Sequence, residues 1–231
     1  MRRNRKNTKL KAANTYKAVH KYLLYLLVWL WAAPLQAQQP SHWQITDEQG
    51  LPSLTVYDLF QDTQGYMWIG TEAGLCRYDG RVFKPYDLKS SKGKALTGLQ
   101  SDQQGRIWFG NFSGQIFFVE NDEVKEFLNI PSFIKEGLSF GIFIDSHNRL
   151  WPFGKNLVYY DINLKEWKVL KKEVLTVSCV ELPGGIMVNN IEQKLYYYTK
   201  ANVLEEIKMP EQMIHLQVLP SKGNILAVDR S

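Results

Sequence analysis

The carboxylate, imidazole and amide side chains of this 231-residue chain are the groups that could bind a ligand or catalyse a reaction. The four histidines form no His-Glu-x-x-His motif or other metal-ligand pair, so we expect no metal site and no cofactor. They are His20, His42, His147 and His215. The sequence also lacks a Gly-x-Ser-x-Gly elbow and a glycine-rich phosphate loop before a helix. These patterns predict that the chain has no catalytic residues of its own.

Several of these groups belong to a repeat that aligns without a gap. Residues 56–80 read VYDLFQDTQGYMWIGTEAGLCRYDG, and residues 96–120 read LTGLQSDQQGRIWFGNFSGQIFFVE. The aspartate, tryptophan and glycine residues recur 40 positions apart: Asp62 and Asp102, Gly65 and Gly105, Trp68 and Trp108, Gly70 and Gly110, and Gly74 and Gly114. Such regular recurrence indicates a repeated unit of structure.

Three further copies follow with decreasing similarity. The third keeps Asp145 and Trp151, the fourth places Val188 where tryptophan stood, and the fifth begins at Ile214. Each unit has apolar runs separated by glycine-bearing turns, which predicts four short antiparallel strands about every 40 residues. We therefore expect an all-β fold, a partial β-propeller over residues 38–231 with about four and a half blades. The expected blade cores lie near 56–86, 96–127, 141–170, 177–208 and 214–231.

The recurring residues have a structural explanation. Aspartate can bond nearby backbone amides in a turn, glycine accepts a positive φ, and a buried tryptophan is worth about 3 to 5 kcal/mol. We assign this role to Asp62, Gly65, Trp68, Gly70, Asp102, Gly105, Trp108, Gly110, Asp145 and Trp151. Cys76 and Cys179 fall in strand-like segments of separate copies, so we expect two small buried hydrophobic residues and no disulfide.

Residues 1–37 have the order of a signal peptide. They hold eight basic residues and no acidic one, and an apolar run of 14 residues precedes Ala37, the expected cleavage point. This run is shorter than the roughly 20 residues that cross a bilayer, although an uncleaved anchor is the alternative. The remainder carries 20 basic and 23 acidic residues, hence a charge of −3, so we expect no nucleic-acid partner.

Residues 50–87 resemble the two-component regulator propeller repeat. The pattern Asp-x-x-Gly-x-x-Trp-x-Gly-Thr, followed by Gly-Leu-x-Arg-Tyr-Asp-Gly, matches Asp62, Gly65, Trp68, Gly70, Thr71, Gly74, Leu75, Arg77, Tyr78, Asp79 and Gly80. The second copy has Asn111 in place of Thr71 and loses the Arg-Tyr-Asp-Gly close. The match is therefore specific in the first copy and weaker in the later ones.

The resemblance implies a function. Such repeats typically form the periplasmic sensor region of Bacteroidetes histidine kinases and hybrid two-component regulators, in propellers of about seven blades. A β-sandwich, a transmembrane helix and kinase domains usually follow, and several of these receptors sense oligosaccharides. We therefore expect a non-catalytic sensor on the periplasmic side of the inner membrane, present as an N-terminal piece of the receptor. Its expected ligand is an oligosaccharide or another small extracellular molecule, and dimerisation is left open.

Ligand contacts are expected on the loops between the second and third strands, because propellers commonly bind where loops of several blades converge. Amides with an aromatic side chain would suit a sugar. The candidates are Thr71, Glu72, Asn111, Phe112, Lys155, Asn156, Asn189 and Asn190. Two alternatives stay open: an exported lyase or glycoside hydrolase whose catalytic residues lie outside this segment, and a protein-interaction scaffold or remnant. Against a sialidase-type site, Asp62 lies three residues before Gly65, whereas that motif places aspartate two before glycine.

Overall fold

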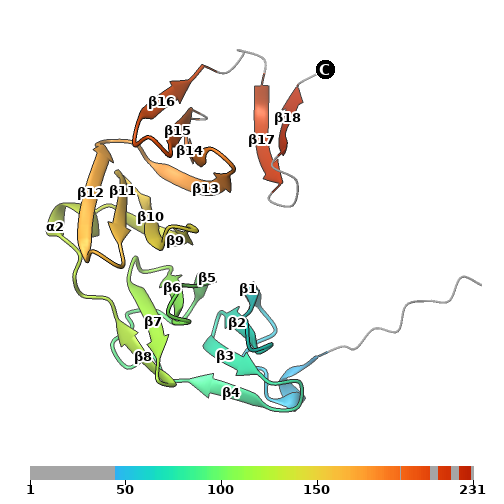
Figure 1. Ribbon diagram of the computed structural model, residues 1–231. Helices are drawn as coiled ribbons and strands as arrows, with labels where there is room; N and C mark the ends of the chain where they lie inside the picture. Colours follow the sequence, from blue (N-terminus) through green and yellow to red (C-terminus); the bar gives the residue numbers. More distant parts are fainter. Residues whose placement is uncertain (1–44, 193, 209–212, 220–223, 230–231) are drawn as a thin grey trace, which may run out of the picture. The chain divides into compact units, whose positions relative to one another are not determined.

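The computed structural model describes residues 45–192, 194–208, 213–219 and 224–229, and the expected leader at 1–37 lies outside them. The first two repeats each form one four-stranded antiparallel sheet, with strands in chain order (Figure 1). Blade one contains β1 (Val56–Gln61), β2 (Met67–Thr71), β3 (Gly74–Tyr78) and β4 (Phe83–Tyr86). Blade two contains β5 (Leu96–Ser101), β6 (Ile107–Asn111), β7 (Ile116–Glu120) and β8 (Glu123–Glu126).

Blades three and four are joined by a backbone bridge. Blade three contains β9 (Leu138–Ile144), β10 (Arg149–Gly154), β11 (Leu157–Asp161) and β12 (Glu166–Lys171). Blade four contains β13 (Thr176–Leu182), β14 (Gly185–Asn190), β15 (Leu195–Thr199) and β16 (Leu204–Ile207). Gly154 pairs with Thr176, and the Thr176 hydroxyl donates a hydrogen bond to the Gly154 carbonyl at 3.1 Å. This bridge merges the two blades into one eight-stranded sheet.

A fifth unit begins with the antiparallel pair β17 (Met213–Leu219) and β18 (Asn224–Asp229). The described helices are short: η1 (Asp47–Gln49) precedes blade one, and α2 (Ser132–Lys135) lies between blades two and three. No helix in the described part of the chain is long and apolar enough to span a membrane. The predicted all-β propeller fold with four-stranded blades is therefore confirmed.

Each recurring tryptophan packs against the blade that follows its own. Trp68 clusters with Leu96 and Leu99 of blade two, and Trp108 clusters with Ile142 and Leu150 of blade three. Trp151 clusters with residues of blade four that include Ile186, Val188 and Tyr198. All three indoles are nearly inaccessible, so the hydrophobic clusters that contain them lie between successive blades.

The aspartate in the turn between the first and second strands of blades two and three accepts hydrogen bonds from both the turn's backbone and the tryptophan indole. Asp102 Oδ1 accepts hydrogen bonds from the backbone N–H groups of Gln104 and Arg106 at 3.0 and 2.9 Å. Its Oδ2 accepts the Trp108 indole N–H at 2.7 Å and the Arg106 Nε–H at 2.6 Å. Asp145 makes the equivalent four bonds with its own turn, Arg149 and Trp151. Because both carboxylates are buried and fully bonded, they are structural groups.

The two cysteines lie in separate blades and carry free thiols. Cys76 on β3 is fully buried against Leu51, Ile69 and Phe83, and burial raises the pKa of its thiol to about 11. Cys179 on β13 is half-buried. A thiol with a raised pKa is a poor nucleophile, so Cys76 acts as a packing residue.

Candidate functional site

Three of the predicted loop residues hold their own loops. The Thr71 hydroxyl is buried and donates to the Gly74 carbonyl at 2.8 Å. Asn111 is fully buried: its Oδ1 accepts the N–H groups of Ser113 and Gln115, and its Nδ2 donates to Ser91, Gly93 and Gln115. Asn190 is also buried, and its Oδ1 accepts the Lys194 N–H at 2.7 Å. These polar side chains therefore stabilise the loops.

Two exposed aromatic side chains meet at the end of the strands that carries the β2–β3 and β6–β7 loops. Phe112, in the β6–β7 loop, has 47% of its surface exposed, and Tyr57 at the start of β1 has 41% exposed. Their ring centroids are 4.8 Å apart with an interplanar angle of 52°. We call Tyr57 and Phe112 the aromatic pair. Glu72 occupies the loop position in blade one that Phe112 occupies in blade two. Each donates its backbone N–H to the residue just before the first strand of its blade, the carbonyls of Thr55 and Ala95.

Tyr57 is not among the residues predicted from the sequence, because a β-bulge sets the direction of its side chain. The pairing of β1 with β2 shifts register between Val56 and Asp58, so Tyr57 is left out of the ladder. Asp58 remains in it and accepts the Leu99 N–H at 2.7 Å across the blade junction. A β-bulge changes the direction of one side chain, and the residue types in this stretch do not predict a bulge.

The other predicted loop residues lie on blades three and four. Lys155 is exposed, and the half-buried Asn156 donates to the Phe133 carbonyl at 3.2 Å and accepts the Glu173 N–H at 3.2 Å. Asn189 lies in β14, and its Oδ1 is inaccessible and has no hydrogen-bond partner among the described residues. No bond in the described part of the chain links these three residues to the aromatic pair. The predicted set is therefore distributed over several loops.

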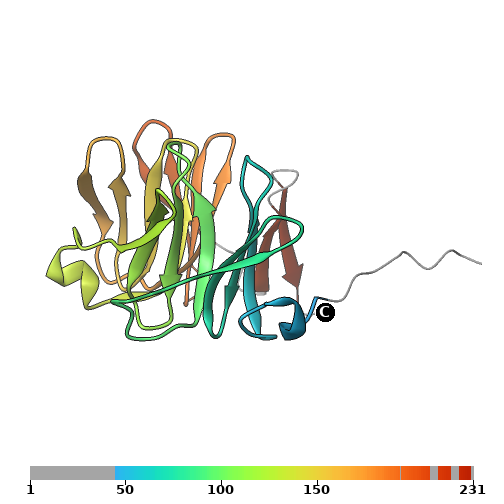
Figure 2. The ribbon, with the colours of Figure 1, turned by 90° about the horizontal axis from the view of Figure 1, so that it is seen from below.

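A cleft of about 360 Å³ lies between blades one and two. The cleft lies beside the β1–β2 turn of blade one and the β5–β6 turn of blade two. These turns are at the opposite end of the strands from the β2–β3 and β6–β7 loops, as the ribbon in Figure 2 shows. We call this the junction cleft. It is lined by Asp62, Thr63, Gln64, Trp68, Arg77, Ser101, Gln104, Gly105, Arg106, Ile107, Val119, Glu120, Asn121 and Asp122. Most of these side chains are polar, which suits a hydrophilic ligand.

Asp122 is an ion-pair centre on one wall of the junction cleft. Its carboxylate accepts hydrogen bonds from Lys84 and Tyr86 of β4, and its Oδ1 is 3.3 Å from Arg77 Nη1 of β3. The Lys84 and Tyr86 bonds hold the pKa of Asp122 below its ordinary value. Burial, together with the bond to Asp122, raises the pKa of Tyr86. The Arg77 guanidinium also lies over the Tyr66 ring, 4.4 Å from its centroid.

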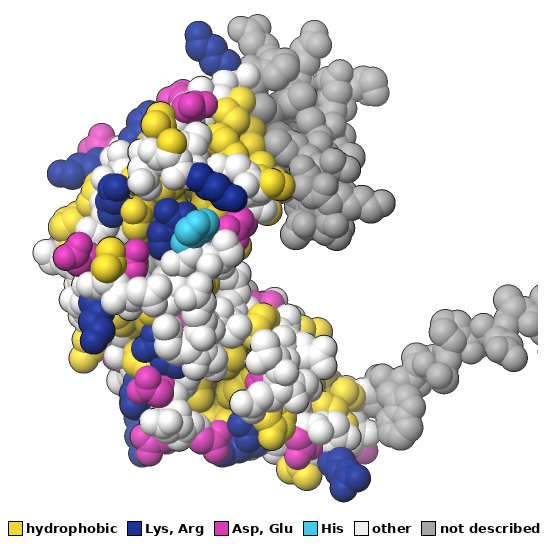
Figure 3. All heavy atoms as spheres, viewed as in Figure 1, with side chains coloured by type: hydrophobic (Ala, Val, Ile, Leu, Met, Phe, Trp, Pro, Cys, Tyr) yellow, Lys and Arg dark blue, Asp and Glu magenta, His cyan; other side chains and the backbone are white. Residues whose placement is uncertain are grey.

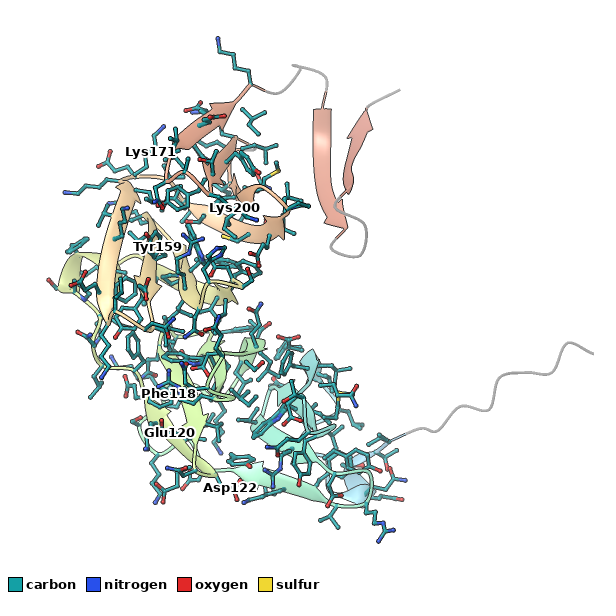
Figure 4. The ribbon with its side chains drawn as sticks, viewed as in Figure 1. Phe118, Glu120, Asp122, Tyr159, Lys171 and Lys200 are labelled. Atoms are coloured by element: carbon teal, nitrogen blue, oxygen red, sulfur yellow. The ribbon has the colours of Figure 1, made fainter. Side chains whose placement is uncertain are left out.

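Glu120 stands near Asp122, where β7 turns into β8 (Figure 4). Its Oε2 accepts a hydrogen bond from Lys125 Nζ at 2.8 Å, which lowers the pKa of Glu120. Its Oε1 is 3.8 Å from Arg106 Nη1, beyond hydrogen-bonding distance. Arg106 is anchored instead through its Nε to Asp102.

The charged residues that line the junction cleft, taken together with their ion-pair partners, sum to zero. The cations are Arg77, Lys84, Arg106 and Lys125, and the carboxylates are Asp62, Asp102, Glu120 and Asp122. Basic and acidic side chains are also interspersed over the face of the molecule shown in Figure 3. The described residues contain no group of histidine, cysteine and acidic side chains suited to a metal ion. Because each of these four cations lies within 4 Å of a carboxylate, most of the charges in this region are paired.

Comparisons with known proteins identify both a repeat and a fold. Residues 50–73 match the family model of the two-component regulator propeller. The extracellular domain of a putative hybrid two-component system from B. thetaiotaomicron is similar in structure, with a TM-score of 0.63 and 17% identity. That match covers 82% of this chain and 28% of the other.

A second similar structure is virginiamycin B lyase from Staphylococcus aureus, with a TM-score of 0.55 and 19% identity. The match covers 69% of this chain and 58% of the lyase. At these identities the likeness concerns the fold. The chain spans less than two thirds of the length of either solved structure. No curated protein sequence matches it.

Proposed function

Because residues 50–73 are a two-component regulator propeller repeat, we propose that this chain is a ligand-binding propeller of a two-component sensor. It works on the periplasmic side of the inner membrane and carries no catalytic residues. It passes the effect of binding to transmembrane and kinase domains of the same receptor. The match of the first blade is the observation that carries this proposal, and the likeness to an extracellular two-component domain supports the same placement.

The proposed ligand is a glycan fragment, bound on the β2–β3 and β6–β7 loops. The aromatic pair provides an exposed apolar surface against which the face of a sugar ring can pack. Glu72 adds an exposed carboxylate on the neighbouring loop, which can accept hydrogen bonds from hydroxyl groups. The buried bonds of Thr71 and Asn111 keep both loops in place, so the surface is formed before the ligand arrives.

Thermal unfolding of the full chain with a broad panel of oligosaccharides tests this function. A ligand at 100 times its dissociation constant should add about 2.7 kcal/mol of stability. We expect Tyr57→Ala and Phe112→Ala each to weaken the glycan's affinity by about tenfold or more. Phe133→Ala is the matched control, because Phe133 is similarly exposed on α2. The proposal fails if no glycan stabilises the chain, or if the control variant loses as much affinity as the other two.

The likeness to a lyase raises an enzymatic alternative, but the described carboxylates favour a binding role. Asp62, Asp102 and Asp145 each accept a hydrogen bond from a tryptophan indole, at 2.8, 2.7 and 2.9 Å. A carboxylate that is committed to a structural hydrogen bond is a poor general acid or base, and Asp102 and Asp145 are buried as well. The aspartates repeated in the blades therefore support structure and not hydrolysis.

A further inference from the structure

The junction cleft is open because of a glycine. Gly105 has a φ of +77°, and a Cβ placed on it would meet no atom within 4 Å. The equivalent residue in blade three is Asn148, whose φ is +62°. Both residues donate their backbone N–H to the carbonyl of their turn's aspartate at 3.0 Å, which establishes the equivalence.

At the junction of blades two and three, the Asn148 side chain closes the corresponding space. Its Oδ1 accepts the Gln103 backbone N–H at 2.9 Å, and its Nδ2 donates to Gln104 at 3.1 Å. Thr63 is the blade-one counterpart of Gln103. Because position 105 is a glycine, the backbone N–H of Thr63 has no acceptor among the described residues. Thr63 lines the junction cleft.

Several hydrogen-bond donors border the junction cleft. They are the Thr63 N–H, the Gln64 side-chain amide and the guanidinium groups of Arg77 and Arg106, of which Arg77 also contacts Asp122 at 3.3 Å. The Asp122 carboxylate is already bonded to Lys84 and Tyr86. A group rich in acceptor oxygens, such as a carboxylate, would satisfy these donors.

Glu120 supplies the complementary charge. Its Oε2 is bonded to Lys125, whereas the nearest donor to its Oε1 among the described residues is Arg106 Nη1 at 3.8 Å. An ammonium group could donate to this oxygen. Because the surrounding charges cancel, a ligand of no net charge leaves the site electrically balanced, whereas a simple anion or cation does not.

We propose that the junction cleft binds a small zwitterion, an amino acid or a dipeptide. Its carboxylate lies among the donors of Thr63, Gln64, Arg77 and Arg106, and its ammonium group lies against Glu120. Since the groups come from both blades, the ligand would clamp blade one to blade two. This site is independent of the aromatic pair, and either could exist without the other.

Isothermal titration of the full chain with each common amino acid and with diglycine tests this site. At least one zwitterion should bind saturably, whereas acetate and methylamine, which each carry only half of the ligand's charge pattern, should bind at least about tenfold more weakly. Glu120→Gln and Arg77→Lys should each weaken binding by about tenfold or more. Glu123→Gln and Arg81→Lys are matched controls on exposed residues outside the cleft, and they should bind as the wild type does.

Gly105→Asn gives a second test that preserves all the charges. The new amide should occupy the cleft as Asn148 does in blade three, abolishing zwitterion binding while the glycan response of the Tyr57 and Phe112 surface persists. The proposal is overturned if no zwitterion binds, if glucose binds in the same cleft with Glu120→Gln unaffected, or if Gly105→Asn binds normally. None of these outcomes bears on the sensor function, which depends on the loops at the opposite end.

Discussion

The two junctions that flank blade two are built around equivalent turns, but they differ in the side chain that occupies the space beside the turn. Between blades two and three, Asn148 is fully buried and bonds to Gln103, Gln104 and Asn163. Between blades one and two, Gly105 leaves a cleft of about 360 Å³ that is bordered by ion pairs. The aspartate and tryptophan that support the turn are the same on both sides. A single side chain at one turn position therefore decides between a sealed contact and a candidate binding site.

The largest effect should come from the scaffold that the junctions share. Asp145→Ala leaves the Trp151 indole N–H and the Arg149 guanidinium without their acceptor, and it should lower the free energy of unfolding by about 3 to 5 kcal/mol. Asp62→Ala should cost less, about 1 to 3 kcal/mol, because Asp62 holds Trp68 without an arginine on its carboxylate. Urea unfolding of both variants measures the difference. Equal losses would show that the arginine contributes nothing to the turn.

Opening the sealed junction should have an intermediate effect. Asn148→Gly keeps the positive φ but removes three hydrogen bonds, so we expect a loss of about 1 to 3 kcal/mol in the free energy of unfolding. Lys165→Gly is the control, since Lys165 is exposed and has a φ of +58°. That variant should be neutral or slightly stabilising. A loss as large as that of Asn148→Gly would mean that glycine itself, and not the missing amide, causes the change.

Filling the open junction should change stability by less than about 1 kcal/mol. Asparagine is tolerated at positive φ, and the space beside Gly105 is empty, so Gly105→Asn meets no clash. The new amide can accept the Thr63 N–H, which offsets the cost of fixing the side chain. Urea unfolding gives the stability. A marked loss would show that the first junction cannot adopt the geometry of the second.

The smallest effect concerns the pH dependence of the first junction. The pKa of Asp122 lies below its ordinary value of 3.8, so its ionised form is favoured by folding. Its contribution to stability is therefore present above about pH 4 and is lost as the pH falls through the lowered pKa. Asp122→Asn should flatten the fall of unfolding free energy below pH 4, whereas Asn148→Gly should leave that slope unchanged. The side chain is 45% exposed, so salt should weaken the effect.

The blades follow directly from the sequence because their determinants are local. Asp102 and Trp108 are six residues apart, and one carboxylate bonds both its own turn and that indole. Gly65 and Gly105 occupy positions with φ of +90° and +77°, which their type indicates. A repeat of such short-range patterns predicts four-stranded sheets without any knowledge of how the sheets meet.

The candidate sites depend on contacts between blades and could not be derived in the same way. Arg77 and Asp122 are 45 positions apart, and nothing in the repeat marks Asp122, which lies in a turn of variable sequence. Tyr57 meets Phe112 only because a bulge turns it out of β1. Conversely, Thr71 and Asn111 were expected to face a ligand, but both are buried and their side chains bond to Gly74 and Gln115 of their own loops.

The repeat, its turns and the burial of its tryptophans can be read from the amino-acid sequence, because these depend on residues a few positions apart. Which polar groups remain without a partner depends on how the blades meet, because any side chain that partners a turn is supplied by the following blade. At Gly105 it brings none, and at Asn148 it brings an amide. The free energy of a polar group is set by whether it has a partner, and partners here come from neighbouring blades.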